Sequence, residues 1–217
     1  MAIPHYDRNF KGAIGLANWI KNNHWFASNE PVNITQGGVW PSFKNAVQKE
    51  RGEREILRYY VDYLTTTSIC KEVDHRFQIL VPKTFNPCHR RFALCKELCH
   101  ILTDNAPFKS HDPIAQLTRA LQTVRQVLNS PKDSELSPLF TSTDLTSEDF
   151  CFLLALEILI PINKRDKIIT DVKVTGTKTA YNVACDLRIP QSLVRFFIES
   201  YYNRAFKQAG GIDVRLE

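Results

Sequence analysis

The segment Lys96-Glu97-Leu98-Cys99-His100 carries side chains that could do chemistry at a spacing known from hydrolytic enzymes. Metal-dependent peptidases use the pattern H-E-x-x-H, in which two ligands one helical turn apart hold the ion and a glutamate activates the bound water. The segment keeps the glutamate and the second histidine, but lysine stands at the first ligand position. Lys96, Glu97, His100 and Asp104 would share an arc of about 100° on a helix. An ordinary solvated helix face carries the same residue types, so this pattern alone does not establish a hydrolytic site.

The elements around this segment can be read from hydrophobic spacing. Arg90–Thr103 contains neither glycine nor proline and predicts a helix whose inner face carries Leu94, Leu98 and Ile101, opposite the polar face. A β-rich run at Arg76–Val81, closed by Pro82, predicts a strand before it. Further helices are predicted at Gly12–Asn23, Glu50–Leu64, Pro113–Leu128 and Ser147–Ile160, the last with Thr146 and Asp149 as a capping box.

The stretch Arg90-Arg91-Phe92-Ala93-Leu94-Cys95-Lys96-Glu97-Leu98-Cys99-His100-Ile101-Leu102 resembles the active-site helix of the ImmA/IrrE family of zincin-type metallopeptidases. That helix runs R-x-F-x-x-A-H-E-L-x-H. The stretch Glu148–Pro161 is similar to the family's E-x-x-A-x-x-F-A-x-x-L-L-x-P helix, and a looser similarity covers Ala180–Phe206, the closing helical hairpin. Together the resemblance spans about residues 50–206.

The resemblance implies an α+β fold: a mainly helical zincin-like domain with a small β-sheet and a C-terminal helical hairpin. We expect residues 1–48 to form an N-terminal extension and residues 49–217 to form the metallopeptidase-like domain. The family's second helix supplies the third metal ligand, which the match places at Glu148. Zinc is the metal that the family implies, and Glu97 would then be the base that takes a proton from metal-bound water.

Lys96 is the departure from the family pattern, because an ammonium group has no lone pair for a metal and is repelled by a divalent cation. Three possibilities stay open. The metal is held by His100, Glu148 and an added ligand such as Asp104, which lies one turn beyond His100. Alternatively, Lys96 replaces the metal electrostatically and holds Glu97 and Glu148 in salt bridges. In the third case its ammonium is an electrophile or proton donor in an altered chemistry.

Three functions from different classes follow. The first is a metal-dependent endopeptidase, and the resemblance implies that its substrate is a helix-turn-helix transcriptional repressor of a stress or mobile-element regulon. The second is a catalytically inactive pseudopeptidase that binds a partner protein as a regulator. The third is a DNA-binding regulator that uses the predicted helix pair Lys178–Leu187 and Gln191–Phe206 together with the basic loop at Lys164–Lys167. We expect no nucleic-acid partner, because the second of these helices carries few basic residues.

Composition sets the remaining limits. The 217 residues are 43% hydrophobic and 24% charged, as in an ordinary globular protein, and the net charge is +5. The longest apolar run, Phe150–Ile162, is too short to span a bilayer, and no secretory signal is visible, so we expect a cytoplasmic protein without a membrane partner. The six cysteines are irregularly spaced and predict buried free thiols. The basic cluster Lys164, Arg165 and Lys167 predicts a solvated loop.

Overall fold

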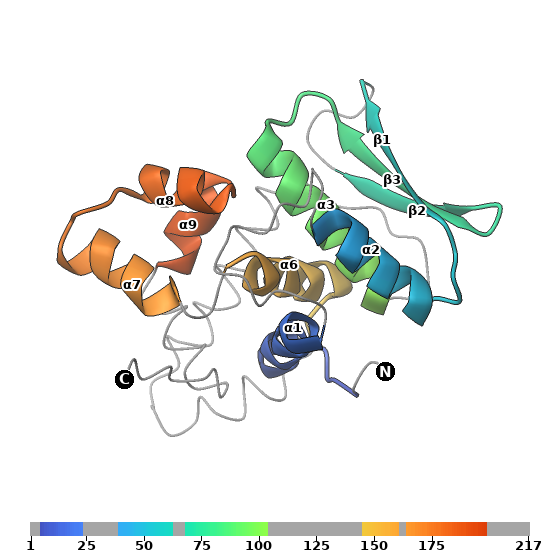
Figure 1. Cartoon of the computed structure of the whole chain (residues 1–217), viewed down its shortest axis with the longest axis horizontal. Coiled ribbons are helices and arrows are strands. Elements are labelled where there is room, and N and C mark those ends of the chain that lie inside the picture. The colour runs from blue at the N-terminus through green and yellow to red at the C-terminus, as the bar shows by residue number, and fades with distance from the viewer. Residues whose placement is uncertain (1–4, 24–38, 63–67, 104–144, 161–163, 199–217) are drawn as a thin grey trace.

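The fold is described from a computed structural model, in which residues 5–23, 39–62, 68–103, 145–160 and 164–198 are placed. Figure 1 shows helices gathered beside one small sheet. In chain order the elements are α1 (Phe10–Asn23), α2 (Val39–Glu50), β1 (Ile56–Val61), β2 (Ile69–Val73), β3 (Arg76–Pro82), α3 (Pro87–Thr103), α6 (Ser147–Leu159), α7 (Arg165–Ile169), the π-helix η2 (Thr170–Val174), α8 (Ala180–Leu187) and α9 (Gln191–Phe197). This is the α+β class predicted from the sequence.

The sheet has the strand order β1-β3-β2, with β1 parallel and β2 antiparallel to β3. Asp74 and His75 join β2 to β3 with positive φ angles of 49° and 59°, as expected of a tight two-residue hairpin turn. The predicted strand at Arg76–Val81 is confirmed as β3. The predicted helix at Glu50–Leu64 is wrong, because its centre forms the strand β1. Ile56, two tyrosines and Val61 favour a strand, and pairing with β3 provides the hydrogen bonds.

Helix α3 lies between the sheet and helix α6 (Figure 1). Asn86 caps its start by accepting a hydrogen bond from the backbone of His89, and Pro87 occupies the first turn, where its missing N–H is not needed. Every residue from Arg91 to Leu102 is buried. The helix was predicted correctly, but its polar face is not solvated as in an ordinary surface helix. It packs against the rest of the protein on all sides.

Helix α6 is also buried along its length, from Glu148 to Leu159. Helix α1 packs on α6, and α2 packs on α3. Apolar side chains from α1 and α2, such as Ile14, Ile20 and Phe43, belong to the same hydrophobic core as α3 and α6. The boundary expected at residue 48 stays a prediction, and the predicted helix at Pro113–Leu128 lies outside the described residues. No helix in the described ranges is long and apolar enough to cross a membrane.

The C-terminal helices are fixed to α6 by a buried ion pair. Arg165 was predicted in a solvated loop, and this is wrong: it begins α7, is 5% exposed and donates to both carboxylate oxygens of Glu157 at 2.6 and 2.5 Å. Its guanidinium also lies 4.5 Å from the centre of the Phe197 ring on α9. A charge within an apolar helix requires such a partner, which explains why Glu157 is tolerated in α6.

Candidate functional site

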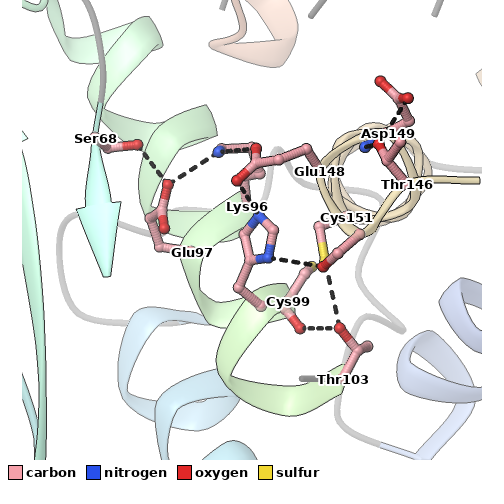
Figure 2. Close-up of polar contacts among 11 residues, drawn as sticks. Ser68, Lys96, Glu97, Cys99, Thr103, Thr146, Glu148, Asp149 and Cys151 are labelled. Atoms are coloured by element: carbon pink, nitrogen blue, oxygen red, sulfur yellow. Dashed lines mark hydrogen bonds and ion pairs between the residues drawn. The ribbon is translucent and has the colours of Figure 1, made fainter. Parts of the chain in front are cut away.

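The two helices that carry the predicted site residues face each other in the core. Helix α3 supplies Lys96, Glu97 and His100, and the first turn of α6 supplies Glu148. Figure 2 shows Lys96 and Glu148 pointing toward one another across the space between the helices. The structure therefore brings together four of the five predicted site residues. The fifth, Asp104, lies outside the described residues.

The position of Glu148 is set by the cap of α6. Thr146 is the N-cap residue, and its hydroxyl accepts a hydrogen bond from the backbone N–H of Asp149 at 3.2 Å. The same hydroxyl donates to the Asp149 carboxylate at 2.7 Å, so the two residues predicted as a cap do interact. With its start fixed in this way, α6 presents Glu148 from its first turn toward α3.

Lys96 lies between two glutamates. Its Nζ atom is 3.0 Å from Glu97 Oε1 and 3.0 Å from Glu148 Oε2 (Figure 2). The exposed fractions of the three side chains are 2% for Lys96, 0% for Glu97 and 11% for Glu148. Screening by solvent is therefore weak here, and the three charges interact much more strongly than they would at the surface.

Three further side chains extend this interaction. Ser68, just before β2, donates to Glu97 Oε1 at 2.7 Å. On the other side, His100 Nε2 lies 3.2 Å from Glu148 Oε1, and His100 Nδ1 lies 3.4 Å from the Ser147 hydroxyl. We call the six residues the Lys96 cluster: Ser68, Lys96, Glu97, His100, Ser147 and Glu148. The cluster links the start of β2 to the start of α6 through the middle of α3.

The surroundings keep the central charges ionised. Burial by itself would raise the pKa of Glu148, but the neighbouring His100 and the Lys96 ammonium lower it to about 2. Burial would likewise lower the pKa of Lys96, yet Glu97 and Glu148 raise it above its usual value. Each group thus stabilises the charged form of the other. At neutral pH the cluster therefore contains the Lys96 ammonium beside the ionised carboxylate of Glu148.

This arrangement does not fit a divalent metal ion. Zinc requires ligand lone pairs, from imidazole nitrogen or carboxylate oxygen at about 2.0–2.2 Å or from thiolate sulfur at about 2.3 Å. In the described protein Glu148 Oε2 faces the Lys96 ammonium and Glu148 Oε1 faces His100. An ion bound to Glu148 and His100 would have to displace Lys96 or be repelled by it. Within the described ranges, no group of three or more His, Cys, Asp and Glu side chains has a geometry suited to a metal.

Comparison with known proteins adds no family assignment. Neither the models of known protein families nor the curated proteins give a significant match to this sequence. The resemblance to the ImmA/IrrE helices therefore rests on the sequence motifs alone.

Sequence reasoning missed two members of the cluster. Ser68 and Ser147 are single serines at the start of a strand and of a helix, where serine is common for local reasons. Ser147 follows the predicted cap and so could have been placed near Glu148. Ser68 carries no such signal, because only the packing of β2 against α3 brings it to Glu97.

Proposed function

We propose that this protein is a metallopeptidase-like regulator that binds a partner protein without cleaving it. The observation that supports this function is the position of the Lys96 ammonium, 3.0 Å from both Glu97 and Glu148. By resemblance to the ImmA/IrrE family, these carboxylates correspond to the catalytic base and to a metal ligand. A zincin-like fold and a lost metal site are parts of the same proposal.

A lysine can replace a metal ion in structure but not in catalysis. Its single positive charge offsets the repulsion between two buried carboxylates, which otherwise would be costly to place together. It does not supply what a hydrolytic metal supplies, namely an acidified water and a Lewis acid for the substrate carbonyl. The Lys96 cluster would therefore preserve the packing of α3 on α6 while removing the chemistry.

In this proposal the partner binds at the edge of the sheet formed by strand β2. In the described part of the chain β2 pairs only with β3 and is an edge of the sheet. An edge strand offers backbone groups to an extended segment of another protein. Because β2 begins beside Ser68, a partner at this edge would lie next to the Lys96 cluster. The family resemblance points to a helix-turn-helix repressor as the partner.

A specific observation also keeps the peptidase as a second candidate. Glu97 Oε2 is buried and has no hydrogen-bond partner among the described residues. Buried carboxylate oxygens usually have a partner, so this atom could accept a proton from a bound water or substrate. In that case Lys96 must move from Glu148 to admit a metal, and Glu97 would be the base.

Partner binding and cleavage can be separated in one experiment. Helix-turn-helix repressors from the same genome would be mixed with the wild-type protein and with Glu97→Gln, with zinc added. Complex formation would be followed by size-exclusion chromatography and repressor integrity by intact mass. We expect both proteins to form a complex with a repressor of unchanged mass, because binding needs the fold and not the base.

The other outcomes are equally informative. Cleavage by the wild type that is lost in Glu97→Gln would establish the peptidase and overturn the proposal. Neither a complex nor cleavage across the set of repressors would argue against this partner class. Circular dichroism of Glu97→Gln must match the wild type, since Glu97 is buried and its replacement must not unfold the protein.

A further inference from the structure

Two of the six cysteines differ from the others in their surroundings. Cys70, Cys95, Cys99 and Cys151 are buried free thiols, as predicted from the sequence. For Cys185 that prediction is wrong, because its side chain is exposed on α8, and Cys88 in the first turn of α3 is only partly buried. These two thiols are therefore the ones in the described protein that solvent reagents can reach.

Arg91 brings the helices of these two cysteines together. Its Nη1 atom donates to the backbone carbonyl of Leu187 and, at 2.9 Å, to that of Arg188 at the end of α8. Cys88 precedes Arg91 by one helical turn and so lies on the same side of α3. Cys185 lies one turn before Arg188, whose N–H donates to the Cys185 carbonyl at 3.2 Å. The first turn of α3 and the last turn of α8 are thus neighbours.

The electrostatics of the region agree with this proximity. The pKa of the Cys88 thiol is raised, first by partial burial and next by the charge of the Cys185 thiolate. The charges of Arg91 and Arg188 act in the opposite direction. The pKa of Tyr181, one turn before Cys185, is raised mainly by its hydrogen bond with Cys185, and the charge of Cys88 contributes as well.

We infer that Cys88 and Cys185 form a reversible disulfide that ties α8 to the first turn of α3 when the protein meets a disulfide oxidant. Oxidised glutathione is such an oxidant. The Cys185 thiolate attacks it, forms a mixed disulfide and releases one glutathione thiolate. The Cys88 thiolate then attacks the Cys185 sulfur, so that the protein disulfide forms and the second glutathione leaves. Two protein thiols are oxidised, and one glutathione disulfide is reduced to two thiols.

The surroundings of the two thiols set this order of steps. Cys185 is exposed and meets the oxidant first. While Cys185 is a thiolate, its charge disfavours ionisation of Cys88. Partial burial raises the pKa of Cys88 throughout, but once Cys185 carries glutathione the second cause, its charge, is gone, while the charges of Arg91 and Arg188 still act to lower that pKa. The first step therefore prepares the second.

The link would join segments that are far apart in the sequence. It closes a loop from the first turn of α3 to α8, which contains α6, α7 and η2. A long closed loop restricts the unfolded chain strongly, so the oxidised protein should melt at a temperature about 5–10 °C higher. The inference does not depend on the Lys96 cluster and holds for a binding regulator and for a peptidase alike.

The test uses the full chain. Reduced protein is incubated with oxidised glutathione, blocked with N-ethylmaleimide and digested without reductant for mass spectrometry. We expect a linked pair of peptides containing Cys88 and Cys185, an intact mass about 2 Da lower before blocking because two hydrogens are lost, and full reversal by dithiothreitol. Cys88→Ser should accumulate a glutathione adduct on Cys185, and Cys185→Ser should form no link.

Two results would overturn the inference. One is a stable glutathione adduct on Cys185 in the wild-type protein without the internal link. The other is a disulfide between the Cys185 residues of two copies. Both substituted sites lie outside the hydrophobic core, so the serine variants should keep the melting temperature of the reduced wild type.

Discussion

Replacing Lys96 with methionine should lower the free energy of unfolding by about 3–5 kcal/mol. Methionine has nearly the same length and fills the same space, but it removes the cation that lies 3.0 Å from Glu97 and Glu148. Two buried carboxylates would then face each other without a counter-charge, and one of them must take up a proton or move into solvent. Urea unfolding at pH 7, followed by circular dichroism, measures the change.

Two further variants of the protein distinguish the effect of losing the charge from the effect of losing side-chain packing. Lys83→Met is the matched control, because Lys83 makes an ion pair of 2.7 Å with Asp62 in which both side chains are more than half exposed. Lys83→Met should lower the free energy of unfolding by less than about 1 kcal/mol. Combining Lys96→Met with Glu97→Gln and Glu148→Gln should recover much of the stability. A Lys96→Met protein as stable as Lys83→Met would contradict the electrostatic role of Lys96.

Acidification should remove a second large contribution to the free energy of unfolding, which comes from Glu148. Its pKa in the folded protein is about 2, against an ordinary value of 4.5. The lowered pKa stabilises the folded state in full at pH values above 4.5. This stabilisation is lost as the pH falls toward 2, because only the unfolded chain takes up the proton in that interval. A shift of this size corresponds to about 3 kcal/mol.

The contribution of Glu148 can be isolated with Glu148→Gln. Urea unfolding of this variant and of the wild type would be compared at several values between pH 6 and pH 3. The wild type should be more stable at pH 6, where Glu148 pairs with Lys96, and its advantage should shrink toward pH 3. Parallel stability curves over this range would show that Glu148 is not held ionised by its neighbours.

The sequence was most informative where structure is set by local spacing. Helices α1, α3 and α6 and strand β3 follow from hydrophobic periodicity and from the prolines and caps around them. The error at β1 has a physical cause. Its apolar residues fit a helical spacing as well, and the choice of strand depends on parallel pairing of Ile56 with Phe77, about twenty residues away. Such pairing is invisible in a local window.

In the candidate site, too, the features set by local spacing could be predicted from the sequence and those set by long-range packing could not. Lys96, Glu97 and His100 are gathered by the helix itself, so their common side could be predicted from three- and four-residue spacing. Glu148 is about fifty residues away and was placed by the resemblance alone, yet it lies 3.0 Å from Lys96. What the sequence did not indicate is the complete burial of this polar face. Periodicity cannot reveal it, because the burial depends on how α6 and the sheet enclose α3.

Metal analysis of the tag-free wild-type protein beside Lys96→His tests most directly whether lysine stands where the metal would be. After incubation with zinc and gel filtration, plasma mass spectrometry would give the metal content of each protein. We expect far less than one zinc per chain in the wild type. We expect close to one in Lys96→His, where an imidazole with a free lone pair joins His100 and Glu148. Near-stoichiometric zinc in the wild type would contradict the account.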